Sequence, residues 1–165
     1  MLTIRDVEPR DIAVVRHLLV ATWHATYDSV LGRDKVTEIT DEWHAPDTLV
    51  RQIGVPGTAF LVAERDGEVI ATAYAACDGD AIMLRRLYVL PAEQQRGVGA
   101  VLLAGTLARF PAARRVTLEV ERANPPAIRF YERNGFAQAR LGACCGDRSD
   151  IQAIIMEKAL TRAEA

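Results

Sequence analysis

Hydrophobic positions follow two periods along the chain, and these periods predict an alternation of helices and strands. After Glu8 the apolar residues recur at helical spacing, which predicts a helix reaching about Tyr27 with one side facing a core. The positions on that side are Ile12, Val15, Leu18 and Leu19. From Arg115 to Glu121 apolar and polar residues alternate, which is typical of a half-buried strand.

Turn residues divide the rest of the chain into further elements. Asp66-Gly67 between two apolar runs is a strong signal for a tight hairpin. Asn124-Pro125 favours a helix start, and Gly135 favours its end. The predicted strands are Leu2–Arg5, Thr58–Arg65, Glu68–Cys77, Ala81–Leu90, Arg115–Glu121, Phe136–Cys144 and Asp150–Ala159. The further predicted helices are Gly97–Phe110, Asn124–Asn134 and one or two short ones within Gly32–Pro56.

This order of elements predicts an α/β (α+β) fold with one mixed sheet. A strand–helix–strand crossover spans residues 81–121 and implies a parallel pair, whereas the hairpins imply antiparallel neighbours. Helices are expected to cover the sheet. A chain of 165 residues without a linker or repeat is expected to form a single domain over its whole length.

Composition narrows the function classes. The net charge of -2 and the pI of about 5.9 argue against wholesale binding to nucleic acid. No uncharged apolar run is long enough for a membrane span, and the charged N-terminus is unlike a signal peptide, so a cytoplasmic protein is expected. The odd count of Cys77, Cys144 and Cys145 argues against a disulfide framework, and the adjacent Cys144 and Cys145 are expected to be reduced thiols rather than a vicinal disulfide. The three histidines lack a metal-ligand spacing, so no metal is expected.

The segment from Leu87 to Ala100 is the strongest candidate for chemistry. An apolar strand ends at Pro91, a polar turn follows, and Gly97 and Gly99 open a helix. Glycines allow close approach of the main chain and backbone conformations that side chains disfavour. The first amides of a helix have no intrahelical partner and carry the positive end of its dipole. The pattern therefore predicts an anion site, and a phosphate fits it.

Other interpretations of the two glycines compete with this one. A dinucleotide fingerprint would need a third glycine where the chain has Leu102, and a P-loop would need Gly-Lys-Ser/Thr. A glycine turn that only packs a helix on a strand remains an equal alternative from these residues alone.

Downstream residues add a second motif. Leu118-Glu119-Val120-Glu121 is followed by Asn124-x-x-Ala127-x-x-Phe130-Tyr131-x-x-x-Gly135-Phe136. Together with Gln94-x-x-Gly97-x-Gly99, this stretch resembles the GNAT superfamily of N-acetyltransferases, most strongly over about residues 81–137. The resemblance implies a mixed, mostly antiparallel seven-stranded sheet with a splayed parallel pair, flanked by about four helices. It also implies acetyl-CoA as cosubstrate and no metal.

The resemblance assigns roles in cofactor binding to three groups of residues. Backbone amides of the turn hold the CoA pyrophosphate, and these are Gln95, Arg96, Gly97, Val98, Gly99 and Ala100. Backbone groups of the preceding strand hold the pantetheine arm, and these are Leu87, Tyr88 and Val89, with the amide near Val89 polarising the thioester carbonyl. Asn124 matches a residue that bonds the arm, although it also suits a helix cap, and the unusual Pro125-Pro126 puts that contact in doubt.

The resemblance also implies a direct attack of an amine on the thioester. Tyr131 matches the acid that protonates the departing CoA thiolate, and its alternative role is an aromatic in the core. Glu119 is a possible base for the incoming amine, and its alternative role is a strand carboxylate. Trp23, Tyr27, Trp43 and His44 lie in the segment that usually lines the acceptor side, although ordinary core packing is the favoured explanation for them.

The sequence does not identify the acceptor. It is expected to be a small-molecule amine or a protein amine. No nucleic-acid or membrane partner is expected, and a homodimer is possible. Two other classes compete with an acetyltransferase. One is a catalytically silent acyl-CoA sensor, which Tyr131 and Glu119 argue against. The other is a nucleotide-binding protein, which the missing lysine after the glycines argues against.

Overall fold

The computed structural model describes residues 1–143 and 152–161. These residues form two compact units. Unit 1 comprises Met1–Ala75 and Arg86–Arg109, and unit 2 comprises the remainder, Ala76–Arg85 and Phe110 onward. The interpretation of Cys144 and Cys145 as reduced thiols falls outside the described residues.

The strands form the predicted mixed sheet, in the order β1-β2-β3-β4-β5-β7-β6. β4 and β5 are parallel, and the pairs β1–β2, β5–β7 and β6–β7 are antiparallel. This arrangement confirms the predicted fold class. The strands are β1 (Leu2–Asp6), β2 (Thr58–Arg65), β3 (Glu68–Asp78), β4 (Ala81–Val89), β5 (Arg115–Glu121), β6 (Ala137–Ala143) and β7 (Gln152–Ala159).

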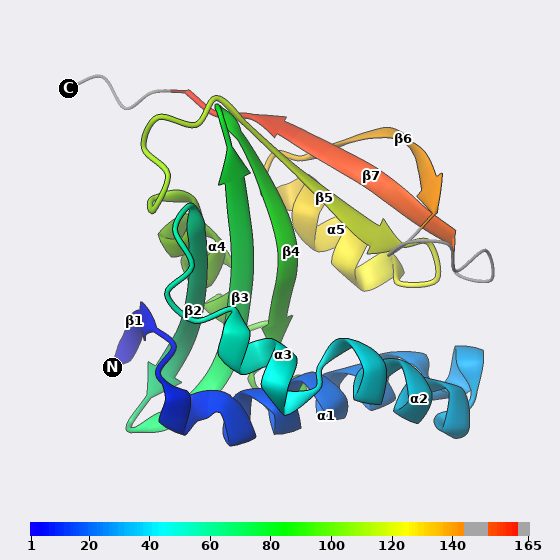
Figure 1. The fold of residues 1–165 in the computed structure, drawn as a ribbon. Helices are drawn as coiled ribbons and strands as arrows, with labels where there is room; N and C mark the ends of the chain where they lie inside the picture. The colour runs from blue at the N-terminus through cyan, green and yellow to red at the C-terminus, as the bar shows by residue number, and fades with distance from the viewer. Residues whose placement is uncertain (144–151, 162–165) are drawn as a thin grey trace. The chain divides into compact units, whose positions relative to one another are not determined.

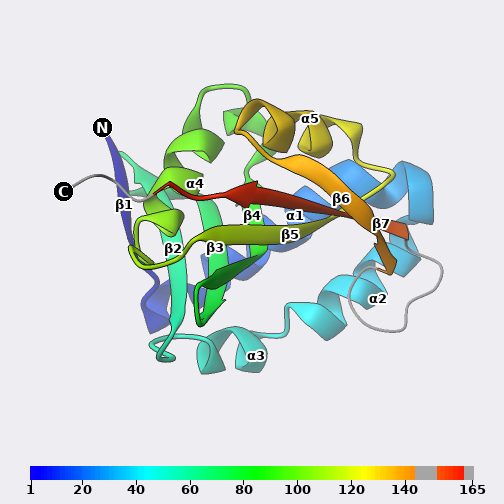
Figure 2. The ribbon, with the colours of Figure 1, turned by 90° about the horizontal axis from the view of Figure 1, so that it is seen from above.

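Four α-helices belong to unit 1. They are α1 (Ile12–Leu31), α2 (Arg33–Trp43), α3 (Pro46–Arg51) and α4 (Val98–Leu107), and short 3-10 turns precede α1 (η1, Pro9–Asp11) and α4 (η2, Pro91–Glu93). Figures 1 and 2 show α1 and α2 side by side. The predicted core-facing positions of α1 are all buried. They pack against the apolar faces of β2 and β3 in a cluster that includes Phe60, Val62 and Tyr74.

Two helix ends differ from the sequence prediction. α1 continues one turn beyond Tyr27 and ends at Leu31, because Gly32 then takes a φ of +83° and its amide closes on the Asp28 carbonyl. α4 ends at Leu107, before the predicted Phe110. Trp23 and Tyr27 therefore lie inside a continuous helix, where packing against α2 fixes them.

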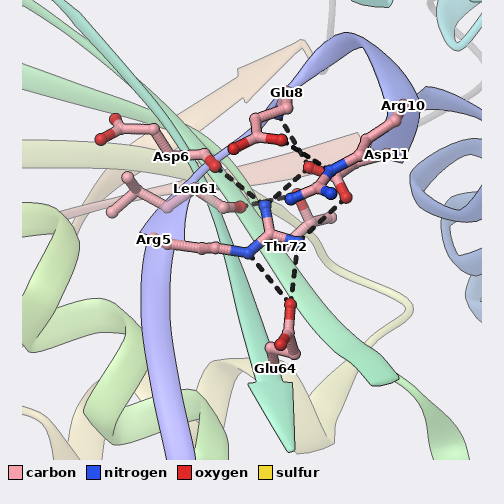
Figure 3. A network of polar contacts seen from close by, with 8 residues as sticks. All are labelled: Arg5, Asp6, Glu8, Arg10, Asp11, Leu61, Glu64 and Thr72. Atoms are coloured by element: carbon pink, nitrogen blue, oxygen red, sulfur yellow. Dashed lines mark hydrogen bonds and ion pairs between the residues drawn. The ribbon is translucent and has the colours of Figure 1, made fainter. Parts of the chain in front are cut away.

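A charged network ties the start of unit 1 together (Figure 3). The Arg5 guanidinium donates to both Asp11 carboxylate oxygens, at 2.7 and 3.0 Å, and to Glu64 at 2.8 and 3.0 Å. Asp11 also accepts from the Glu8 amide at 2.8 Å. We call Arg5, Asp11 and Glu64 the Arg5 network. It joins β1, η1 and β2 with every charged group paired.

Unit 2 is built around β5, β6, β7 and α5 (Pro125–Arg133). Along β5 the apolar positions Val116, Leu118 and Val120 are buried, as the alternation predicts. Gly135 ends the segment after α5 with a φ of +89°, and the Lys158 ammonium donates to the Asn134 carbonyl at 2.8 Å. In the part of the chain that the structure describes, no helix is long and apolar enough to cross a membrane.

Candidate active site

The candidate site begins where β4 leaves its parallel neighbour. The β4–β5 pairing runs from Ala81–Arg115 to Leu84–Leu118, although β4 itself continues to Val89. Beyond its last residue the chain is fixed by the Leu90 amide, which donates to the Ile70 carbonyl of β3 at 2.9 Å. The predicted pantetheine positions, Leu87 to Val89, therefore lie on the part of β4 that has left the parallel ladder.

The turn after β4 is held by its own polar groups. The Glu93 amide donates to the Leu90 carbonyl at 2.8 Å, and the Gln94 side chain donates to the Val89 carbonyl at 3.0 Å. Gln95 and Gly97 then take positive φ angles of 62° and 80°. Gly97 caps α4, and its carbonyl accepts the first helical bond, from Val101.

This turn and the start of α4 contain a run of backbone donors. Among the described residues, the amides from Gln95 to Ala100 donate to no backbone or side-chain acceptor. Because the first three helical amides also carry the positive end of the helix dipole, the segment is suited to an anion with several oxygens. The predicted pyrophosphate positions thus form one continuous donor segment within unit 1.

The role predicted for Gly99 in this turn is wrong in one respect. It was expected to take a conformation that a side chain would forbid, but it is the second residue of α4 and has no positive φ. The residue that takes a positive φ together with Gly97 is Gln95, which is not a glycine. The turn needs the left-handed conformation two residues earlier than the glycine pattern suggests.

Charges beside the donor segment are partly balanced. Arg96 is exposed, and its guanidinium lies 3.8 Å from the Glu93 carboxylate, which also pairs with Arg65. Glu93 thus holds Arg96 near the turn, and the charge of Glu93 is shared between Arg96 and Arg65. Its charge remains near the six amides and adds to their preference for an anion.

Tyr131 lies in unit 2, on α5, and is 8% exposed. Its ring packs edge-on against Phe130 and Phe136, at centroid distances of 5.1 and 5.5 Å. Burial raises the pKa of its phenol above the ordinary value, and the negative charge of Glu121 raises that pKa further. The phenol is therefore kept protonated at neutral pH, as a proton donor requires.

The other predicted residues of unit 2 have separate positions. Glu119 is exposed on β5, on the side opposite the buried Leu118 and Val120. The carboxylate whose charge acts on Tyr131 is Glu121, two residues further along β5. Asn124 caps α5, and its side-chain oxygen accepts from the Ala127 amide at 3.3 Å. The cap that the sequence allowed is formed, and the contact of Asn124 with pantetheine stays a prediction.

The aromatic residues on the predicted acceptor side gather in unit 1. The Trp23 ring lies 4.6 Å from Tyr27, 5.5 Å from Trp43 and 6.4 Å from His44. We call these four residues the aromatic cluster. Trp23, Tyr27 and His44 are almost fully buried, whereas Trp43 is half-buried. The cluster is part of the core, and it also contains buried polar atoms without hydrogen-bond partners among the described residues.

Two polar side chains of the aromatic cluster lack hydrogen-bond partners. Trp23 Nε1 and both ring nitrogens of His44 are buried and make no hydrogen bond with any described residue. Burial is the main cause that lowers the pKa of His44 to about 3, and the charges of Arg86 and Arg16 lower it further. Each buried polar atom without a partner costs about 1–3 kcal/mol, so the pair is expensive for the fold.

Sequence reasoning missed Arg86. It is buried on β4, its guanidinium lies over the rings of Tyr74 and Phe60 at 4.7 and 5.1 Å, and it donates to Gln52 at 2.6 Å. A signal existed in the alternation of β4, because Ile82, Leu84 and Arg86 occupy every second position and are all buried.

The predicted residues thus fall into two sets. All nine backbone positions for the cofactor lie in unit 1, and Glu119, Asn124 and Tyr131 lie in unit 2. In the described part of the chain, no group of three or more His, Cys, Asp or Glu side chains is arranged to hold a metal ion.

Comparison with known proteins identifies a family. The model of the acetyltransferase (GNAT) family matches residues 16–136, which include both the glycine turn and the Asn124–Phe136 motif. No match was found among curated protein sequences.

Two of the solved structures compared share the fold over nearly the whole chain, and a third shares it over about two thirds. PaiA N-acetyltransferase from Thermoplasma acidophilum, in complex with coenzyme A, aligns with a TM-score of 0.85 at 22% identity, over 97% of this chain and 99% of that protein. The ribosomal-protein-S18-alanine N-acetyltransferase from Escherichia coli has a TM-score of 0.73 at 23% identity, over 99% and 96%. Nourseothricin acetyltransferase has 0.59 at 28% identity, over 64% and 67%.

Proposed function

The chain belongs to the GNAT acetyltransferase family, and on that premise we propose that it transfers the acetyl group of acetyl-CoA to a primary amine. The observation that carries the proposal is the run of amides from Gln95 to Ala100, which donate to no acceptor within the described residues. Six adjacent donors at a helix start suit a pyrophosphate, which presents several anionic oxygens.

The donor is proposed to bind along unit 1. The turn amides would hold the pyrophosphate, with the charge of Arg96 beside them. Backbone groups of Leu87 to Val89, beyond the parallel ladder, would bind the pantetheine arm. The amide near Val89 would donate to the thioester carbonyl and stabilise the oxyanion that forms there.

The proposed reaction is a direct displacement. The amine nitrogen attacks the thioester carbonyl carbon, forming a C–N bond, and the C–S bond then breaks to release the CoA thiolate. The amine arrives largely as an ammonium ion, because amines of this kind have pKa values of about 10, and Glu119 is proposed to take its proton. The nitrogen loses a second proton as the C–N bond forms. Tyr131 gives a proton to the thiolate, and this second proton restores the phenol. The proton held by Glu119 passes to solvent, so the reaction releases one proton overall.

The burial of Tyr131 shapes this last step. A thiol has an ordinary pKa of about 8.5, well below that of a phenol, so proton transfer from Tyr131 to the thiolate is uphill. The raised pKa of Tyr131 makes this proton transfer still less favourable. Tyr131 therefore acts first as a hydrogen-bond donor that stabilises charge on the leaving sulfur, and the transfer is completed as the sulfur departs.

The test is a screen for CoA release with a panel of amines, followed by the variant Tyr131→Phe. We expect turnover to fall by about 100-fold or more, because a positioned acid contributes about that much, while the affinity for acetyl-CoA stays the same. Wild-type turnover by this variant would remove Tyr131 as the acid. Tight acetyl-CoA binding without turnover of any amine would favour the acyl-CoA sensor instead.

A further inference from the structure

The polar atoms of Trp23 and His44 point to a ligand that the fold alone does not explain. Both side chains are more than nine-tenths buried, and three of their nitrogens have no hydrogen-bond partner among the described residues. Buried polar groups in native proteins are nearly always hydrogen-bonded, so each exception calls for a binding role or an internal water. Here the two exceptions are neighbours, with ring centroids 6.4 Å apart.

The chemistry of these atoms selects the ligand. An indole nitrogen is a donor only, and a neutral imidazole offers one donor and one acceptor. The charges of Arg86 and Arg16 both act on His44, but Arg16 is paired with Asp41 at 2.8 Å, so the positive charge near His44 comes chiefly from Arg86. Two N–H donors in a positive field suit an anionic group with two acceptor oxygens, as in a carboxylate.

The location connects this pair with the proposed reaction. Arg86 lies on β4 three residues before Val89, the position proposed to hold the thioester carbonyl. Among the members of the aromatic cluster, Trp43 is the half-buried one, and it packs edge-on against Trp23. Because Trp23 and His44 are only 2% and 4% exposed, a carboxylate reaches their nitrogens only if neighbouring side chains move.

We propose that Trp23 and His44 recognise a carboxylate on the acceptor, so that the preferred acceptors are amino acids or other amines that carry a carboxylate. This inference rests on the proposed function, and it names the acceptor class that the sequence left open. Trp23 and His44 are specificity-determining residues in this scheme and touch no reacting atom.

The first test measures binding without catalysis. Trp23 and Trp43 are the two tryptophans of the chain, so fluorescence excited selectively in tryptophan reports on this cluster. The probes are glycine, β-alanine and 4-aminobutyrate, each compared with its amide. We expect a saturable change with at least one amino acid and at least ten-fold weaker binding of its amide. A bound carboxylate should also raise the pKa of His44, because its negative charge favours the protonated imidazole. NMR can follow this change, since the chain has only three histidine signals to assign.

The second test uses variants and CoA release. His44→Leu and Trp23→Phe should each lower the ratio of kcat/KM for an amino acid over its amide by about five-fold or more. His17→Leu, on the exposed side of α1, is the matched control and should keep the ratio. Equal turnover of acid and amide would overturn the inference and leave the acetyltransferase intact. A fluorescence preference without any CoA release would instead overturn the proposed function and keep the carboxylate site. No fluorescence change with any amino acid, together with no CoA release, would also overturn the inference.

Discussion

The Arg5 network, which is partly buried, and the Trp23–His44 pair, which is fully buried, are two polar regions of unit 1, and they are built in opposite ways. In the Arg5 network one guanidinium serves two carboxylates through four hydrogen bonds (Figure 3). In the Trp23–His44 pair, three nitrogens have no partner in the described residues. A satisfied network holds elements together, whereas an unsatisfied pair costs stability and is retained for another reason.

The largest expected effect comes from breaking the Arg5 network. Arg5→Met leaves the carboxylate of Asp11, which is almost fully buried, without its cation, and Arg5 also holds the pKa of that carboxyl below its usual range. Removing one partner of a buried pair typically costs about 3–5 kcal/mol, and partial exposure of Arg5 places the expected loss near 3 kcal/mol. Urea unfolding at pH 7 measures it.

A matched substitution tests whether burial is the cause. Arg109 pairs with Asp6 at 3.0 Å, and both side chains are substantially exposed. Arg109→Met should therefore change the free energy of unfolding by less than about 1 kcal/mol. Equal losses in the two variants would show that the Arg5 network is no more than a surface ion pair.

Acid separates the two regions, because they titrate in different ranges. His44 has a folded pKa of about 3, below the unfolded value of about 6.5, so the unfolded chain binds the extra proton between these values. Stability should fall as the pH drops from about 6.5 toward 3, by about 2 kcal/mol between pH 7 and pH 5. Asp11, whose pKa is lowered, keeps its stabilising charge above about pH 4 and does not contribute to the change between pH 7 and pH 5.

The variant His44→Leu isolates that acid dependence. Unfolding curves at pH 7 and pH 5 should show a smaller loss in His44→Leu than in the wild type. The same loss in both proteins would mean that groups other than His44 carry the acid sensitivity.

The smallest expected effect is that of His44→Leu at pH 7. Because the imidazole nitrogens have no partners, an apolar side chain of similar volume removes a desolvation cost of about 1–3 kcal/mol and loses no hydrogen bond. After repacking, we expect unchanged stability or a gain of about 1 kcal/mol. A loss of 2 kcal/mol or more would mean that His44 has a structural partner, such as an internal water.

Local signals account for what the sequence predicted well. Asp66-Gly67, Asn124-Pro125 and Gly135 each set the backbone through their own conformational limits, so the hairpin and both ends of α5 followed from a few residues. The alternation of β5 likewise predicted its buried face. The acetyltransferase family came from motifs whose spacing the chain preserves.

Features made by tertiary contacts were not predictable in the same way. The burial of His44 comes from packing of α1 against α2, and nothing in the residues around His44 signals it. The left-handed conformation of Gln95 depends on the whole turn, since no preference of glutamine favours it. The role of Glu121 beside Tyr131 also emerged only in three dimensions, because Glu119 and Glu121 share a face of β5 by sequence.

The central claim is that the turn amides bind the pyrophosphate of acetyl-CoA, and calorimetric titration of Gly97→Val with acetyl-CoA tests it most directly. Gly67→Val is the matched control, because Gly67 has a similar φ of +85° but lies in the β2–β3 hairpin. We predict at least ten-fold weaker binding for Gly97→Val, and wild-type affinity for Gly67→Val once both are shown to be folded. Unchanged affinity in Gly97→Val would contradict the account.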